Sequence, residues 1–307
     1  MITKLMKESL IGKILSKIPY LRYAYYYRRN SNHRPGHYYS SVVNLDELEM
    51  RKEAIWSADR KLPGIDLNVA GQQKFVPALE NASNLIPFSE NAGSPNFRYH
   101  FDNKTYAHAD GLVLFAMLMN YKPKRIIEVG SGFSSALMLD TNDKFLNNSI
   151  NFTFIEPYPG MTLTKLLRKE DYANTAVRES MVQNVKPEIF STLQENDILL
   201  IDNSHVSKTG SDVNYLMTEV LPTLNKGVLI HIHDIFYPFE YPQEWLFDLR
   251  LNWNEIYTVH NFLLFNNAFE IVFFSDFMQQ KLKEENYPGL PLFLKDRPGS
   301  LWLRKIK

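Results

Sequence analysis

Two short segments carry the acidic and histidine side chains that are best suited to chemistry. The first is Asp202-Asn203-Ser204-His205, and the second is His231-Ile232-His233-Asp234. Carboxylates such as those of Asp202 and Asp234 bind hard divalent cations through oxygen. A cation held there would stabilise a substrate hydroxyl as the hydroxyl loses its proton. Because the imidazole of His205 titrates near neutral pH, it could accept that proton as a general base.

A glycine-rich turn indicates where a cofactor would bind. The apolar run 126–129 ends in Gly130-Ser131-Gly132, and a helical pattern follows. Glycines allow a ligand to approach the backbone closely. The N-terminus of a helix offers unpaired N–H groups to an anion or a polar ligand. The dinucleotide-binding fingerprint asks for a third glycine where this chain has Ser135, so a nucleoside cofactor of another kind fits the turn better.

The glycine turn is one of four motifs that follow one another along the chain. Glu128 stands two residues before Gly130, and a second apolar run ends in Glu156. Two later apolar runs lead into the segments that contain Asp202 and His233. In order and spacing, these motifs resemble class I S-adenosylmethionine-dependent methyltransferases. They are most similar to a metal-assisted branch that contains natural-product O-methyltransferases and cephalosporin hydroxylases.

The resemblance, which covers residues 100–275, implies methyl transfer from S-adenosylmethionine and a set of cofactor contacts. One acid would accept from the ammonium of the methionine moiety, directly or through water. The glycine turn would lie against the cofactor, and a second acid would bind two ribose hydroxyls. The residues at these positions are Glu128, then Gly130, Ser131 and Gly132, and finally Glu156.

The same resemblance implies catalytic and metal-binding roles. In the resembling O-methyltransferases, the Asp of an Asp-x-x-His segment binds a metal, its His acts as the base, and an acidic pair completes the metal site. Asp202 and His205 match these positions, so both are predicted as catalytic residues. Asp202, His233 and Asp234 are the predicted ligands of Mg²⁺ or another divalent cation. His233 departs from the pattern, because an acid often stands there, and its imidazole would favour a metal that accepts nitrogen.

Two other functions stay open at this point. His231 and His233 lie two residues apart on a predicted strand and therefore point to the same side. Together with Asp234 they resemble the ligand set of a non-haem iron oxygenase, which would make the protein a metal-dependent hydroxylase on the same fold. The simpler interpretation of His231 is a hydrogen-bonded core histidine. A non-catalytic cofactor-binding or scaffold protein is the third alternative, because a fold does not determine a function.

The elements that would position these residues alternate between helix and strand, which is typical of a mostly parallel sheet covered on both faces. We predict an α/β, doubly wound, seven-stranded sheet of the Rossmann-like methyltransferase type, whose last strand is typically antiparallel. The candidate acids and histidines fall at the carboxyl ends of strands, where open sheets of this kind bind their ligands. The predicted strands lie near 125–129, 151–155, 176–182, 197–202, 227–232, 269–274 and 300–305, and the predicted helices near 106–121, 134–146, 161–171, 211–221 and 254–266.

The N-terminal part has a different composition. Residues 1–36 contain eight lysines and arginines against the single acid Glu8, and apolar residues recur at helical spacing between positions 2 and 18. We expect residues 1–98 to form a basic amphipathic helix and an irregular cap or lid, and residues 99–307 to form the methyltransferase domain. The basic helix favours either peripheral contact of residues 1–29 with an anionic membrane or packing on its own domain or on a second subunit.

Composition limits the remaining choices. The formal net charge of the 307 residues is zero, so no global charge favours nucleic acid. The chain has no cysteine and no apolar run of the ~20 residues that a membrane span needs. We therefore expect a cytoplasmic protein that acts on a small-molecule or sugar acceptor. Aromatic residues between Phe236 and Trp245 could wall the pocket for that acceptor.

Overall fold

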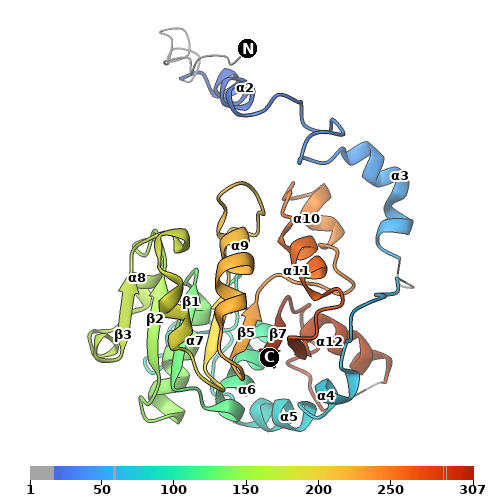
Figure 1. The fold of residues 1–307 in the computed structure, drawn as a ribbon. Helices are drawn as coiled ribbons and strands as arrows, with labels where there is room; N and C mark the ends of the chain where they lie inside the picture. Colours follow the sequence, from blue (N-terminus) through green and yellow to red (C-terminus); the bar gives the residue numbers. More distant parts are fainter. Residues whose placement is uncertain (1–16, 58–59, 286, 288) are drawn as a thin grey trace. The chain divides into compact units, whose positions relative to one another are not determined.

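The computed structural model describes residues 17–57, 60–285, 287 and 289–307, and the chain divides into two compact units (Figure 1). The sheet unit comprises residues 58–245 and 253–307. The N-terminal unit comprises residues 1–57 and 246–252. The candidate catalytic and cofactor-binding residues all belong to the sheet unit.

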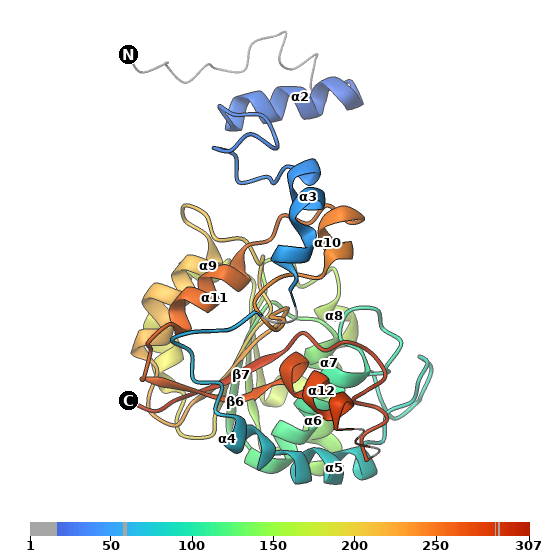
Figure 2. The ribbon, with the colours of Figure 1, turned by 90° about the vertical axis from the view of Figure 1, so that its right-hand side faces the viewer.

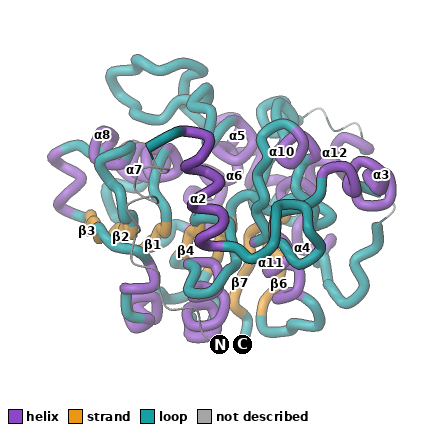
Figure 3. The backbone as a smooth tube through the Cα atoms, turned by 90° about the horizontal axis from the view of Figure 1, so that it is seen from above, coloured by secondary structure: helices purple, strands orange, loops and turns teal. Residues whose placement is uncertain are grey.

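The sheet has seven strands in the order β3-β2-β1-β4-β5-β7-β6. Strands β1 to β5 are parallel to one another, and β7 runs antiparallel to both β5 and β6, as predicted. Figure 3 shows β3, β2, β1 and β4 side by side in this order. The strands are β1 (Arg125–Val129), β2 (Asn151–Ile155), β3 (Thr175–Arg178), β4 (Ile198–Ile201), β5 (Leu229–Ile232), β6 (Phe269–Phe274) and β7 (Leu301–Lys305).

Helices cover both faces of this sheet, which confirms the predicted doubly wound α/β class. Figure 2 shows α9 and α11 on one face and α5, α6, α7 and α12 on the other. The helices of the sheet unit are α4 (Val69–Gln73), α5 (Val76–Leu85), α6 (His108–Tyr121), α7 (Phe133–Phe145), α8 (Leu163–Leu166), α9 (Asp212–Tyr215), α11 (Glu255–Leu263) and α12 (Ser275–Glu284), and α10 (Gln243–Phe247) lies at the junction of the two units.

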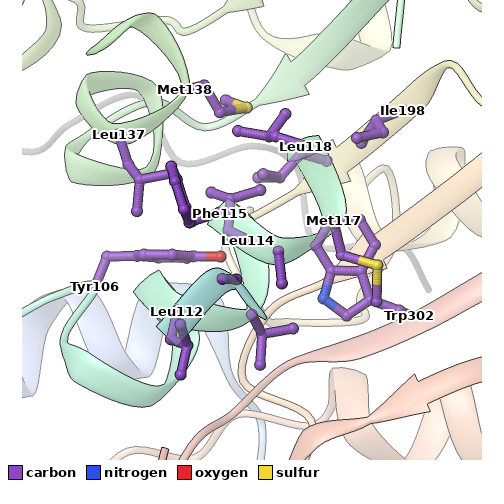
Figure 4. Close-up of a cluster of buried hydrophobic side chains, with 14 of the residues drawn as sticks. Tyr106, Leu112, Leu114, Phe115, Met117, Leu118, Leu137, Met138, Ile198 and Trp302 are labelled. Atoms are coloured by element: carbon purple, nitrogen blue, oxygen red, sulfur yellow. The ribbon is translucent and has the colours of Figure 1, made fainter. Parts of the chain in front are cut away.

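The main core lies between α6 and the sheet. Every residue of α6 from His108 to Leu118 is buried, so this helix is apolar around most of its circumference. A helix with that pattern must be covered on several sides. Figure 4 shows Leu114, Phe115 and Met117 of α6 in one cluster with residues of α7, β4 and β7. Burying this helix fixes the short segment before it, which borders the functional site.

The structure corrects the predicted domain boundary at residues 98 and 99. The division falls after Ser57, because α5 packs its apolar side against α6. Phe75, Leu79 and Ala82 are buried in the main core. Residues 58–98 are therefore part of the sheet unit. The regular helices α4, α5 and α12 were missed, and the predicted helix at 161–171 is only α8 followed by the 3₁₀ turn Lys169–Ala173.

In the N-terminal unit, two helices, α2 (Pro19–Asn30) and α3 (Leu45–Ile55), bury none of their residues. The Val43 N–H donates to Asn252 Oδ1 at 3.0 Å, and Trp56 lies 6.1 Å from Phe247, measured between ring centroids. Most of the predicted basic amphipathic helix lies outside the described residues. Among the described residues, none of the helices is both long and apolar enough to cross a membrane.

Candidate functional site

The turn between β1 and α7 places its two glycines in different surroundings. Gly130 has a φ of +78°, and a Cβ atom there would lie 1.7 Å from the backbone oxygen of Asp202. A side chain at Gly130 would therefore collide with the end of β4. A Cβ at Gly132 would meet nothing within 4 Å. Of the two, only Gly132 faces open space. The approach of a ligand to Gly132 stays a prediction, whereas Gly130 is needed for packing.

This turn borders a hollow of about 290 Å³, which we call the first hollow. Glu156 lies on its wall and accepts from the Ser131 N–H at 3.2 Å and from the Tyr158 N–H at 2.7 Å. Ser131 Oγ is buried and has no hydrogen-bond partner in the described part of the chain. The lining residues are Thr105, Tyr106, Gly130, Ser131, Gly132, Phe133, Ser134, Glu156, Thr162 and Asp202.

Glu128 does not line the first hollow. Its carboxyl group is completely buried and accepts from the hydroxyls of Ser134, at 2.5 Å, and Ser135. Burial raises the pKa of Glu128 to about 8, although both serine hydroxyls oppose this shift. The group therefore faces α7, and its contact with a cofactor ammonium stays a prediction.

Asp202, His205 and Asp234 come together at the carboxyl ends of β4 and β5. One ligand atom from each residue lies within 4.8 Å of the others, a spacing that could hold a metal ion. His205 Nε2 lies 3.3 Å from Asp202 Oδ1 and 3.4 Å from Asp234 Oδ2. Two carboxylates and an imidazole are a donor set that divalent cations accept. We call these three residues the acid–histidine group.

The opposite edge of the His205 ring is held by residues that the sequence patterns did not single out. His205 Nδ1 lies 2.9 Å from Glu255 Oε2, and Glu255 Oε1 accepts from Asn203 Nδ2 at 2.9 Å. Glu255 is fully buried, and the Trp253 ring packs against the imidazole at a tilt of 36°, with a centroid separation of 4.4 Å. A histidine oriented in this way presents one defined nitrogen to a ligand. Glu255 lies in the first turn of the predicted helix at 254–266. An acid at that position was the one feature of the sequence that could have pointed to it.

The charges of the group depend on one another. Burial favours neutral Asp202, but His233 and His205 outweigh it and lower the pKa of Asp202 to about 2. Burial raises the pKa of Asp234 to about 6. Burial lowers the pKa of His205, but Asp202 and Glu255 together hold it well above the usual value. Asp202, Glu255 and Asp234 therefore favour the protonated form of His205 when no metal ion is bound.

Comparison with known proteins shows the family to which these motifs belong. The sequence model of a family described as a methyltransferase domain matches residues 127–235, which include the glycine turn, Glu156 and the acid–histidine group. The chain belongs to the class I methyltransferases, which use S-adenosylmethionine. An uncharacterised protein of Archaeoglobus fulgidus is 36% identical over 168 residues, which are 53% of this methyltransferase and 75% of the archaeal protein.

Solved structures similar to this methyltransferase include two that were determined with a cofactor or its product. The S-adenosylhomocysteine-bound methyltransferase PaMTH1 of Podospora anserina is 16% identical, covers 87% of this chain and 99% of its own, and has a TM-score of 0.45. The O-methyltransferase TomG of Streptomyces achromogenes, in complex with S-adenosylmethionine, is 10% identical, covers 85% and 96% of the two chains, and has a TM-score of 0.42.

His231 and His233 lie outside the acid–histidine group of this methyltransferase. His205, rather than the predicted ligand His233, completes the group. The His233 ring stacks on Tyr106 with centroids 5.0 Å apart, and its Nε2 lies 3.6 Å from Asp234 Oδ1. His231 is fully buried against Trp302, and neither of its ring nitrogens has a hydrogen-bond partner among the described residues. The iron ligand set of the hydroxylase alternative is therefore not assembled within the described chain.

Proposed function

We propose that this methyltransferase transfers the methyl group of S-adenosylmethionine to a hydroxyl oxygen of a small molecule or sugar, with His205 as the base. The observation that carries the proposal is the orientation of His205. Its Nδ1 is fixed by buried Glu255, and its Nε2 faces Asp202 and Asp234. Asp202 also lines the first hollow, so the proposed base lies beside the proposed cofactor site.

The residues around the first hollow fit the cofactor. The Glu156 carboxylate at the end of β2 is suited to a pair of ribose hydroxyls, and the open space beside Gly132 lets a ligand reach the backbone. The buried Ser131 hydroxyl has a hydrogen bond to offer. When bound, S-adenosylmethionine supplies a methyl group on a positively charged sulfur.

In the proposed reaction, His205 Nε2 takes the proton of the acceptor hydroxyl. The acceptor oxygen then forms a bond to the methyl carbon as the carbon–sulfur bond breaks, and the electron pair stays on sulfur. Asp202 and Asp234 would hold a divalent cation, whose charge would favour both the ionised acceptor and the neutral form of His205 that a base requires. Holding the acceptor and the base in place would supply most of the remaining rate enhancement.

The test compares His205→Ala with His37→Ala, which changes a histidine of the N-terminal unit. Calorimetry with S-adenosylhomocysteine, with and without Mg²⁺, measures cofactor affinity. Transfer of an isotope-labelled methyl group to fractionated small-molecule extracts measures turnover. We expect His205→Ala to lower turnover by roughly 10²–10⁴-fold and to leave S-adenosylhomocysteine affinity within about threefold, and His37→Ala to change neither.

Three results would contradict parts of this proposal. A product that gains oxygen instead of methyl would reject methyl transfer. Full turnover of His205→Ala would reject the base. Loss of Mg²⁺ binding in His205→Ala, restored by His205→Asp together with turnover, would show that His205 is a metal ligand and that another group accepts the proton.

A further inference from the structure

A second hollow of about 340 Å³ also borders the acid–histidine group. Asp234 and His233 form part of its wall, whereas Asp202 lies on the wall of the first hollow. Thr105 borders both hollows. The two carboxylates beside the candidate base His205 therefore border different hollows, one proposed for the cofactor and one still without an assigned ligand.

An aromatic wall connects the second hollow to His205. Phe236 and Trp245 line the hollow and pack edge to face with ring centroids 5.2 Å apart. Trp245 lies 5.4 Å from Trp253, and Trp253 lies 4.4 Å from the His205 imidazole. Trp253 thus lies between the wall of the second hollow and the proposed base, and Asp234 is the member of the acid–histidine group that a ligand in this hollow can reach. Aromatic faces of this kind bind the apolar face of a ring through stacking.

The cations around the second hollow are already paired. Arg297 Nη2 lies 2.7 Å from Asp276 Oδ2, and Lys295 Nζ lies 3.0 Å from Glu90 Oε2. Lys104 donates a hydrogen bond to the carboxylate of Asp102. Among the described residues, each lysine or arginine that lines this hollow thus has a carboxylate partner. An acceptor with a phosphate or carboxylate group would have to displace one of these partners. The hollow therefore offers an anionic acceptor no unpaired lysine or arginine among the described residues.

One carboxylate on the wall of the second hollow has an oxygen that could accept a hydrogen bond from a ligand hydroxyl. Asp110 is only 9% exposed, and its Oδ2 accepts from the Gly299 N–H at 3.0 Å. Its Oδ1 is buried and has no hydrogen bond of ordinary geometry in the described part of the chain, and the Ser300 hydroxyl is a side-chain group that acts on this carboxyl. Because buried oxygen atoms are normally hydrogen-bonded, this atom is suited to a donor from a ligand. A ligand hydroxyl is such a donor.

We infer that the second hollow binds an uncharged, polyhydroxylated ring, such as a sugar residue, as the methyl acceptor. This inference rests on the proposed function and narrows its acceptor class. The ring stacks on Trp245, and its hydroxyls donate to Asp110 Oδ1. The position of Asp234 on the same wall brings one of those hydroxyls to the acid–histidine group. The paired cations explain why the ring carries no charge.

The experiment measures saturation-transfer NMR on the full chain loaded with S-adenosylhomocysteine. The neutral probes are methyl β-D-glucopyranoside and methyl α-L-rhamnopyranoside. The comparison probes are glucuronate, glucose 6-phosphate and catechol. We expect saturation transfer to at least one neutral glycoside to exceed transfer to every comparison probe. Trp245→Leu and Asp110→Asn should each weaken glycoside binding by roughly five- to tenfold, whereas the exposed-residue variant Tyr172→Leu should not change it.

S-adenosylhomocysteine affinity, measured on every variant, separates this inference from the proposed function and shows that each variant folds. Wild-type protein that binds no S-adenosylhomocysteine would contradict the proposed function, and the glycosides would then be tested on the unloaded chain. Stronger transfer to an anionic probe or to catechol would overturn the inference. So would the absence of transfer to both glycosides, or unchanged glycoside binding in both Trp245→Leu and Asp110→Asn.

Discussion

At the scale of single residues, Glu128 makes the stability of this protein depend on pH. Its carboxyl group is fully buried, and burial raises its pKa from 4.5 to about 8. Between these two values the unfolded chain has lost the proton and the folded chain has kept it. The folded state therefore binds more protons, and its stability falls as the pH rises from about 4.5 to about 8.

Glu128→Gln should remove this dependence, because an amide keeps its hydrogen-bonding groups and does not ionise. Relative to the variant, wild-type protein should lose about 3–5 kcal/mol of unfolding free energy between pH 4.5 and pH 8. Urea unfolding at several pH values measures the difference, and the exposed-residue variant Glu179→Gln is the control. Parallel curves for wild type and Glu128→Gln would show that the buried carboxyl is ionised in the folded protein.

At the scale of elements, the three-residue turn between β1 and α7 serves both the packing of the sheet and the space proposed for the cofactor. Gly130 lets the chain leave β1 directly against the backbone oxygen of Asp202, which follows the paired strand β4. Gly132 precedes α7 and leaves room in the first hollow. The two positions hold the same residue type, but a side chain at Gly130 would meet the backbone, whereas a side chain at Gly132 would enter open space. Substitution can therefore separate folding from cofactor binding.

Gly130→Ala should lower the unfolding free energy by about 2–4 kcal/mol, because the residue has positive φ and its Cβ would overlap a backbone oxygen. Gly132→Val should lower the unfolding free energy by less than about 1.5 kcal/mol. It should weaken S-adenosylhomocysteine binding by at least roughly tenfold, which is the effect of losing one hydrogen bond to a charged group. Urea unfolding and calorimetry measure the two effects. Unchanged affinity in a folded Gly132→Val protein would mean that the cofactor does not pass this residue.

At the scale of the whole molecule, the N-terminal unit has a charge and surface unlike the neutral chain as a whole. Helix α2 exposes Tyr20, Tyr23 and Tyr26, and its last turn contains Arg28 and Arg29. Tyrosines and arginines together suit the interface of an anionic membrane. We propose that residues 1–29 make peripheral contact with such a surface, with contact between two copies of the chain as the alternative.

Sedimentation with vesicles of phosphatidylserine and phosphatidylcholine tests this contact. We expect binding at low salt that weakens several-fold between 50 and about 500 mM NaCl, because salt screens exposed charges. Deletion of residues 1–30 should abolish vesicle binding and leave S-adenosylhomocysteine affinity unchanged. Binding that survives the deletion would place the membrane contact elsewhere. A deletion that converts dimers to monomers without changing vesicle binding would favour the contact between copies.

Local sequence patterns determined most of the sheet. Apolar runs of four to six residues lead to the candidate positions Glu128-Val129, Glu156, Asp202 and His233. All seven predicted strands are present in the structure. These features are readable because strand formation and the carboxyl-end rule depend on short segments and their order. The helices α4, α5 and α12 were not readable, because their stability comes mainly from packing against distant parts of the core.

Only the tertiary structure decided which polar side chains meet. The family resemblance predicted Asp202 and Asp234 as ligands of one metal ion together with His233, whereas the fold groups them with His205. The reason is that His205 adopts a positive φ of 56° and its ring is turned by Glu255 and Trp253, which are about fifty residues away along the chain. Periodicity gives the side of a strand on which a residue lies. The direction of a loop side chain depends on partners that only folding brings together.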